Sequence, residues 1–245
     1  MYLALNIICL LLAAVSSVLT VIRTTHMFQL NSYKTAVQLK WMGGNFRHYI
    51  INIILLVISI AATFTNAVWL YIVFYVFALI SALVNRPMKN AKKPLVYTAR
   101  VKRMLVTDCV IWLAAFAAAF FAGGERFGLL GMGILLSLAP LLPVIGNIVN
   151  SPIEKAIRQY YINDAKKMLK ACPDLKVIGI TGSYGKTSVK YYLSTVLKAK
   201  YNVLMTPESY NTPMGVVKTI REQLRPTHEV FVCEMGARHV GDIKE

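Results

Sequence analysis

Acidic residues are scarce in this sequence of 245 residues, which has 11 Asp and Glu against 27 Lys and Arg and a formal net charge of +16. Residues 1–22 and 49–85 contain no charged residue at all. Hydrophobic residues make up 56% of the chain, more than the usual share of a globular domain. Long stretches without charge therefore indicate a membrane part.

Metal-binding and disulfide patterns are missing as well. The four cysteines show no CxxC spacing and the four histidines show no HExxH spacing. We interpret the cysteines as reduced core residues and infer no metal held by protein ligands alone. No RNA-binding signature accompanies the positive charge, so nucleic acid is excluded as the expected partner. Cytoplasmic loops that face anionic lipid explain the charge better.

The uncharged stretches predict about five transmembrane helices, since a spanning helix needs about 20 apolar residues. The start of the chain, MYLALN, lacks the Lys or Arg of a signal peptide, so we interpret the first helix as a retained anchor. The five expected spans are residues 1–22, two helices within 49–85 divided at the polar step Thr63, Thr65 and Asn66, residues 105–122 and, after a turn at 123–126, residues 127–149.

Loop charge predicts the orientation of these helices. The loops after the first and third spans are rich in Lys and Arg, whereas the loops after the second and fourth are nearly bare. Cytoplasmic loops collect Lys and Arg. Five spans therefore place the N-terminus outside and the C-terminal half of the chain in the cytoplasm.

Two features of the membrane half allow two interpretations each. Asp108 lies within a predicted span, where acids are often functional, but an interfacial ion pair with Arg103 or a carboxylate that reaches the interface explains it better. Pro140 and Pro143 interrupt the last span, where they either line a cavity or only kink the helix.

Residues 151–173 predict a basic amphipathic junction helix. Ser151, Pro152 and Glu154 form the pattern of a capping box, and apolar residues then recur at helical spacing among several lysines. The sequence Cys172-Pro173 ends the helix. The helix either packs on the following domain or lies on the inner leaflet of the membrane.

Residues 179–188, GITGSYGKTS, have the pattern of a phosphate-binding loop. The apolar run at 176–180 predicts a strand before the loop, and the apolar spacing at 189–197 predicts a helix after it. Such a loop aims successive backbone N–H groups and a helix N-terminus at an anion.

Individual residues of the loop have expected roles. Gly182 and Gly185 allow the tight backbone path. Lys186 can reach the β and γ phosphates, and Thr187 offers a hydroxyl to Mg²⁺. Glu234 follows a buried-strand pattern, at the edge of a parallel sheet where ligands bind, so it either completes the Mg²⁺ site or is a surface glutamate in a turn.

Three motifs resemble the Mur ligase family. The spacing T-G-S-x-G-K-T-S is the short form of that family's ATP loop rather than the usual G-x-x-x-x-G-K-[ST]. The sequence TPESYNTPMGVVKTI (206–220) looks like its substrate and phosphate loop. The sequence VFVCEMGARHVGDI (230–243) looks like a segment of the branch that adds D-alanyl-D-alanine.

The resemblance implies an ATP-dependent amide ligase of peptidoglycan precursor synthesis. A substrate carboxylate takes the γ-phosphoryl group to give an acyl phosphate, which an amine attacks. The acid is a UDP-muramoyl peptide and the amine D-alanyl-D-alanine, with ATP and Mg²⁺ as cofactors. The implied site residues are Gly182, Ser183, Tyr184, Gly185, Lys186, Thr187 and Ser188 for ATP, Asn211, Thr212 and Gly215 for the substrate or phosphate, Thr187 and Glu234 for Mg²⁺, and Lys186 and His239 for catalysis. The alternative interpretation of His239 is an ordinary exposed histidine in a loop.

The expected fold is an α-helical membrane domain (1–150), the junction helix (151–173) and an α/β P-loop domain with a parallel sheet (174–245). Family members continue beyond this segment, so we expect an incomplete central domain with uncovered apolar sheet faces, inactive on its own. The expected location is the bacterial cell membrane, multi-pass, with the bilayer and lipid-carrier enzymes as partners. The alternatives are a membrane-anchored ligase that acts on a lipid-linked or glutamate-containing peptide, and a nucleotide-regulated transporter.

Overall fold

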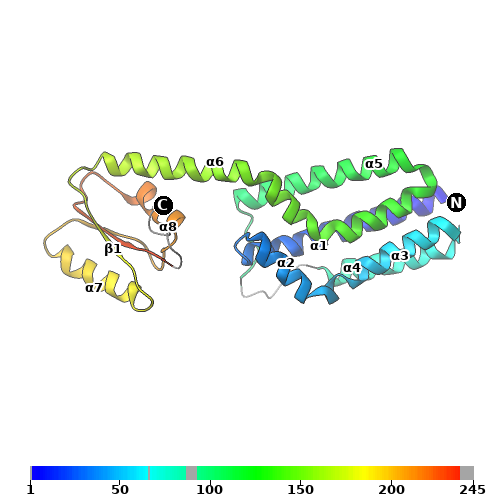
Figure 1. Ribbon diagram of the computed structural model, residues 1–245, viewed down its shortest axis with the longest axis horizontal. Coiled ribbons are helices and arrows are strands. Elements are labelled where there is room, and N and C mark those ends of the chain that lie inside the picture. Colours follow the sequence, from blue (N-terminus) through cyan, green and yellow to red (C-terminus); the bar gives the residue numbers. More distant parts are fainter. Residues whose placement is uncertain (1, 66, 87–92, 238–245) are drawn as a thin grey trace. The chain divides into compact units, whose positions relative to one another are not determined.

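The computed structural model describes residues 2–65, 67–86 and 93–237, and the chain divides into two compact units, Met1–Pro152 and Ile153–Glu245. We call them the helical unit and the sheet unit (Figure 1). Their elements, in chain order, are α1 (Tyr2–Leu30), α2 (Thr35–Gly44), η1 (Phe46–His48), α3 (Ile50–Thr65), α4 (Trp69–Val84), α5 (Ala99–Leu138), η2 (Ala139–Leu141), α6 (Leu142–Lys170), β1 (Lys176–Ile180), α7 (Lys186–Lys198), β2 (Val203–Met205), α8 (Pro213–Gln223) and β3 (Val230–Glu234).

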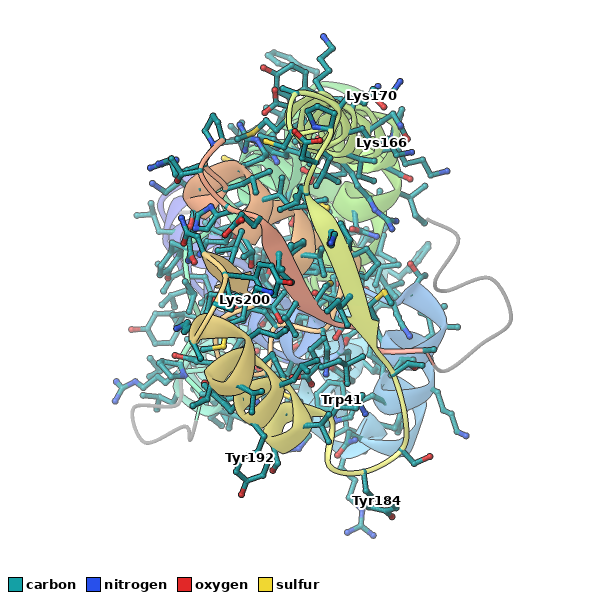
Figure 2. The ribbon with its side chains drawn as sticks, turned by 90° about the vertical axis from the view of Figure 1, so that its left-hand side faces the viewer. Trp41, Lys166, Lys170, Tyr184, Tyr192 and Lys200 are labelled. Atoms are coloured by element: carbon teal, nitrogen blue, oxygen red, sulfur yellow. The ribbon has the colours of Figure 1, made fainter. Side chains whose placement is uncertain are left out.

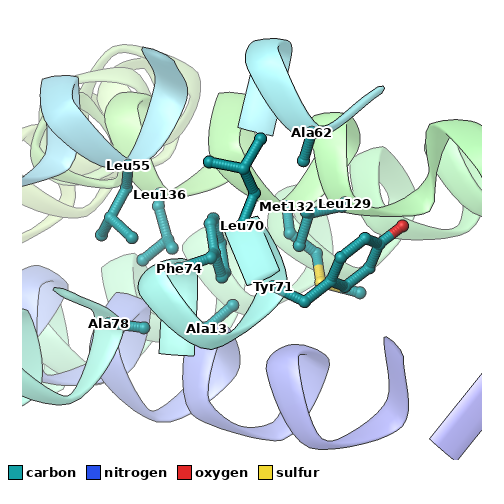
Figure 3. Close-up of a cluster of buried hydrophobic side chains, with 10 residues drawn as sticks. All are labelled: Ala13, Leu55, Ala62, Leu70, Tyr71, Phe74, Ala78, Leu129, Met132 and Leu136. Atoms are coloured by element: carbon teal, nitrogen blue, oxygen red, sulfur yellow. The ribbon is translucent and has the colours of Figure 1, made fainter. Parts of the chain in front are cut away.

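The helical unit packs α1, α3, α4 and α5 against one another. Their apolar side chains meet in one cluster, where Leu55 of α3, Phe74 of α4 and Leu136 of α5 are fully buried (Figure 3). The predicted division of residues 49–85 into two helices is confirmed, since α3 ends at Thr65 and α4 begins at Trp69.

Polar side chains are buried inside the helical unit, whereas many large apolar ones face outward. The Ser16 hydroxyl donates to Ser81 Oγ at 2.8 Å, and the Ser81 hydroxyl donates to the side-chain Oδ1 of Asn52 at 2.9 Å. Asn52 Nδ2 donates to the backbone carbonyl of Leu136 at 3.0 Å. Exposed apolar side chains on these helices include Val18, Val57, Phe64, Ile72, Val106 and Val110. This distribution is the reverse of a water-soluble bundle, in which polar groups face out.

Two segments of the described chain are long and apolar enough to cross a membrane, Leu11–Leu30 and Gly128–Lys170. The helices α3 and α4 are apolar, but each has 16 residues, short of the roughly 20 that a span needs. The prediction of five spans is therefore not confirmed by helix length.

Residues 123–126 are helical, inside α5 (Ala99–Leu138), in place of the predicted short turn, although the chain reverses its direction as that turn requires. No proline interrupts 123–126, so every backbone N–H can continue the helix. The chain still reverses, since Asn150 donates to Thr107 at 2.9 Å. If residues 107–150 formed one straight helix, Thr107 and Asn150 would lie about 65 Å apart. Figure 1 shows the ribbon turning back.

The predicted capping box at Ser151 was also wrong. Ser151 and Pro152 lie inside α6, which begins at Leu142. Pro152 removes one backbone N–H, but the hydrogen bonds of the neighbouring residues maintain the helix. The interruption falls earlier, at the short 3-10 turn η2 around Pro140. The predicted end of the helix is confirmed, because α6 stops at Lys170.

The described part of the sheet unit has three parallel strands in the order β1-β3-β2. The predicted strand at 176–180 is β1, and the predicted strand before Glu234 is β3. The side chains of β3 alternate between two apolar clusters. Val232 packs toward Leu193 of α7, while Phe231 packs toward Ile220 of α8 and Ile162 of α6.

Some apolar side chains of this unit are exposed. Val177 of the edge strand β1 is 56% exposed, and Tyr192 and Val196 of α7 are 74% and 72% exposed. Figure 2 shows Tyr192 projecting away from the molecule. The central strand β3, by contrast, is buried along its whole length.

Candidate functional site

The phosphate-loop sequence connects β1 to α7 as the sequence predicts. Gly182 has φ of +148° and Gly185 has φ of +73°, in a region of φ that side chains with a Cβ rarely adopt. Gly185 lies directly before the first turn of α7. The tight backbone path of this loop therefore depends on glycine at both positions.

The side chains of the loop point in different directions. Lys186 folds back and donates from Nζ to the Gly182 carbonyl, so its charge lies over the loop. Tyr184 is 96% exposed and projects outward in Figure 2, while Ser183 and Ser188 are exposed at the loop and in the first turn of α7. Lys186 is thus the loop side chain positioned to meet an anion there.

Glu234 at the carboxyl end of β3 is the centre of the site. Its carboxylate accepts hydrogen bonds from Thr187 Oγ1 at 3.0 Å and from Asn211 Nδ2 at 3.3 Å. Its backbone N–H donates to Thr206 Oγ1 at 3.1 Å. The structure therefore brings together three residues that are distant in the sequence: Asn211 follows Thr187 by 24 residues, and Glu234 follows Asn211 by 23.

The segment before α8 is held tightly against the end of β3. The Asn211 carbonyl accepts from the Gly236 N–H at 2.8 Å, and a Cβ on Gly236 would lie 2.9 Å from that same oxygen. Glycine at 236 therefore permits this close approach, which fixes the position of Asn211 beside Glu234.

Thr212 and Gly215, expected at the substrate or phosphate, form the N-terminus of α8. The Thr212 hydroxyl accepts from the Gly215 N–H at 3.2 Å, and Pro213 occupies the first turn. The N-termini of α7 and α8 both lie near Glu234, and helix N-termini attract anions. The arrangement suits a negatively charged ligand.

Thr212→Ala is expected to destabilise α8 by about 1 kcal/mol, because it removes the hydrogen bond that caps the helix. Thr212→Ser keeps an acceptor and serves as the control. Hydrogen exchange of the α8 amides measures the change. Equal protection in Thr212→Ala and Thr212→Ser would contradict a capping role.

Lys190 is a site residue that the sequence analysis missed. Its side chain is fully buried, and Nζ lies 3.2 Å from Glu234 Oε2 and also donates to the Glu208 carbonyl. Its position in the sequence, one helical turn after Lys186 and on the apolar face of α7, could have indicated that it is buried near the loop. The carboxylate of Glu234 therefore lies next to a buried positive charge.

Hydrogen bonds determine the ionisation of Glu234. Burial by itself raises the pKa of this carboxyl, but hydrogen bonds from Lys190, Thr187 and Asn211, with the charge of Lys190, outweigh it and hold the pKa below its ordinary value of 4.5. The neighbouring Cys233 thiol has its pKa raised to about 11 by burial and by the charge of Glu234, so it stays protonated near neutrality.

The stability of the sheet unit is expected to depend on pH through Glu234. Because the folded pKa lies below the ordinary value, the ionised carboxylate stabilises the fold above pH 4.5, and this contribution is lost as the pH falls through the folded pKa. Hydrogen exchange of β3, corrected for intrinsic rates, should show this loss as the pH falls below 4.5. The loss should be smaller in Glu234→Gln. An identical pH profile in Glu234→Gln would contradict the assignment.

No cluster of three or more His, Cys, Asp or Glu side chains that could hold a metal ion occurs in the described part of the chain. His239, expected to help catalysis, lies outside the described residues. Thr187 Oγ1 and the carboxylate of Glu234 are the oxygen ligands that the sequence predicts for a cation, and the structure places them 3.0 Å apart.

Comparison with known protein families adds to this geometry. The family model described as "Mur ligase middle domain" matches residues 180–245. We call residues 180–245, which are similar to part of that domain, the Mur ligase segment. The matched residues begin at the end of β1 and include the phosphate loop, the Asn211 segment and Glu234. The resemblance predicted from the three sequence motifs is confirmed for this part of the chain.

Over part of its length, the chain is similar to curated proteins named UDP-N-acetylmuramoyl-tripeptide--D-alanyl-D-alanine ligase. The Synechocystis protein is 42% identical over 69 residues, 28% of this chain and 15% of that protein. The Escherichia coli protein is 30% identical over 103 residues, 39% of this chain and 23% of that protein. The chain therefore spans less than a quarter of the length of these relatives. No solved structure matches the chain significantly.

Proposed function

We propose that this protein is an ATP-dependent ligase that joins a carboxylic acid to an amine. The observation that carries the proposal is the position of Glu234, which is fixed between Thr187 of the phosphate loop and Asn211 before α8. A phosphate loop with a carboxylate beside its threonine suits a nucleotide with bound Mg²⁺. The Mur ligase segment supports amide bond formation as the reaction.

In the proposed reaction the phosphate loop binds ATP and orients its γ-phosphoryl group toward a substrate carboxylate. The backbone N–H groups of the loop and the N-terminus of α7 bind phosphate oxygens. Lys186 adds a positive charge where negative charge develops during transfer. The carboxylate oxygen attacks the γ-phosphorus, ADP leaves, and an amine then displaces phosphate from the acyl phosphate.

Mg²⁺ fits the oxygen ligands of this site. Thr187 Oγ1 and Glu234 Oε2 lie 3.0 Å apart, and both are hard oxygen ligands. Mg²⁺ commonly takes one or two protein oxygens together with water and substrate phosphates. When bound, it neutralises charge on the transferring phosphoryl group. Lys190 supports the site by keeping Glu234 ionised.

We propose a UDP-muramoyl peptide as the acid and D-alanyl-D-alanine as the amine. Support comes from the names of the similar proteins and from the third sequence motif, which ends near His239. A lipid-linked or glutamate-containing peptide is the alternative acid substrate, and product analysis distinguishes the two.

Phosphate release by the full-length protein in membranes tests the reaction. ATP, Mg²⁺ and UDP-muramoyl tripeptide are supplied with and without D-alanyl-D-alanine. We expect release only when both substrates are present. If nucleotide binds but neither substrate stimulates release, the proposed ligase function is wrong.

We also propose that the helical unit holds this ligase at the bacterial cell membrane, with the sheet unit in the cytoplasm beside lipid-carrier enzymes. Two observations support a lipid environment for the helical unit. Its large apolar side chains face outward, and the hydrogen-bonded polar side chains of Ser16, Ser81 and Asn52 are buried. Alkaline carbonate extraction should leave the protein in the membrane pellet. Release into the supernatant would contradict membrane integration.

A further inference from the structure

The helical unit contains a second candidate site, a cavity of about 260 Å³ between α1, the first part of α5 and the start of α6. Its walls are mostly apolar, with Val21 of α1, Leu105 of α5 and Leu142 of α6 among the lining residues. An apolar cavity of about 150 Å³ is large enough to bind benzene. This cavity therefore has room for a larger aliphatic or aromatic group.

Three buried polar groups line the same cavity without a hydrogen-bond partner among the described residues. They are both carboxylate oxygens of Asp108, the indole Nε1 of Trp112 and the hydroxyl of Ser17. Asp108 and Ser17 are each only 2% exposed. Buried polar groups in native proteins are nearly always hydrogen-bonded, so the unpaired acceptor oxygens of Asp108 and Ser17 at one cavity indicate a ligand that donates hydrogen bonds. The expected ion pair between Asp108 and Arg103 at the interface is not observed, since the carboxylate is buried and neither oxygen accepts a hydrogen bond.

The neighbouring helix leaves space for the carboxylate of Asp108. Gly146 of α6 faces it, and a Cβ at that position would lie 2.1 Å from Asp108 Oδ1. A side chain at 146 would therefore displace the carboxylate. The nearby Arg100 donates instead to Asn147 Oδ1 at 2.9 Å. No Lys, Arg or His of the described chain lines the cavity.

We propose that this cavity binds an aliphatic amine in its ammonium form. The ammonium group donates to the carboxylate of Asp108, and the hydroxyl of Ser17 can accept a further N–H. The aliphatic body occupies the apolar remainder of the cavity. A charge-assisted hydrogen bond in surroundings of low dielectric is stronger than a neutral one, so the charge of Asp108 makes the site selective for the cation.

Trp112 provides a reporter for the test, because it lines the cavity and the chain has three tryptophans. Trp41→Phe and Trp69→Phe in the protein, reconstituted in phosphatidylcholine nanodiscs, leave Trp112 as the single tryptophan of residues 1–245, excited selectively over tyrosine. The probes are octylammonium, octanol with the same chain and no charge, and tetramethylammonium with charge and no chain. We expect a saturable change in Trp112 fluorescence at about tenfold lower concentration of octylammonium than of octanol or tetramethylammonium.

Two variants separate the charge of Asp108 from its position. Asp108→Asn keeps the shape, and Gly146→Ala keeps the charge but displaces the carboxylate. Each should abolish the tenfold preference for octylammonium, whereas Asn147→Ala, outside the cavity lining, should retain it. Equal binding of octylammonium and octanol, or an unchanged preference in Asp108→Asn, would overturn the proposal.

A measurement without any variant covers the case in which Asp108→Asn fails to fold. Dicyclohexylcarbodiimide adds covalently to carboxyl groups in apolar surroundings, and peptide mass spectrometry detects the adduct on Asp108. Octylammonium should slow the labelling of Asp108 in the unaltered protein, and octanol should slow it much less. Labelling at the same rate with either probe would overturn the proposal.

Discussion

Lys186→Ala is expected to lower the rate of substrate-dependent phosphate release by about 100- to 1,000-fold, the usual effect of removing one group that stabilises charge in a transition state. The Lys186 ammonium lies over the Gly182 carbonyl within the loop, where no other side chain of the loop supplies a positive charge. The effect should fall on the maximal rate as well as on the apparent KM for ATP. Phosphate release at saturating and limiting ATP separates the two.

Lys200→Ala is the matched control, since it removes the same charge beyond the far end of α7. Lys200 lies with its Nζ 5.6 Å from the ring centre of Tyr201, away from the loop. This variant should retain the activity of the unaltered protein. If Lys186→Ala and Lys200→Ala show equal activity, the loop does not bind the transferring phosphate.

Lys190→Met is expected to cost about 3–5 kcal/mol of stability in the sheet unit, because it leaves the buried carboxylate of Glu234 without its charged partner. Lys190 is fully buried and its Nζ lies 3.2 Å from Glu234 Oε2. The variant should also raise the pKa of Glu234 and weaken Mg²⁺-dependent nucleotide binding. Hydrogen exchange of β3 measures the stability, and titration with ATP and Mg²⁺ measures the binding.

The double variant Lys190→Met with Glu234→Gln separates lost charge from lost packing. Removing both members of a buried pair is commonly much less costly than removing one, so much of the stability should return. Nucleotide binding should not return, because the carboxylate is absent. Equal destabilisation in the single and double variants would show that Lys190 acts through packing alone.

Local patterns in the sequence predicted the phosphate loop and its flanking elements well. The strand before Gly182 and the helix that begins at Lys186 follow from short-range spacing, and both glycines have the positive φ that the loop requires. Glu234 was also predicted correctly at the end of a strand, because the carboxyl edge of a parallel sheet is a property of the topology.

Contacts between distant segments could not be predicted from the same patterns. In the sequence, Lys190 is one polar residue on a predicted helix. The packing of α7 against β3 buries it beside Glu234. Thr206 gains its role in the same way, through the Glu234 N–H. The capping box at Ser151 fails for the opposite reason: a correct local signal is overridden because the helix continues from the preceding segment.

Isotope transfer tests the central claim, ATP-dependent ligation through an acyl phosphate, most directly. The acid substrate is labelled with ¹⁸O in its reacting carboxylate and incubated with the full-length protein, ATP, Mg²⁺ and D-alanyl-D-alanine. The account predicts that each amide bond formed transfers one ¹⁸O atom to the released phosphate, as mass spectrometry of the phosphate can show. Phosphate that carries only unlabelled oxygen, while amide product accumulates, would contradict an acyl phosphate and with it the proposed role of the phosphate loop.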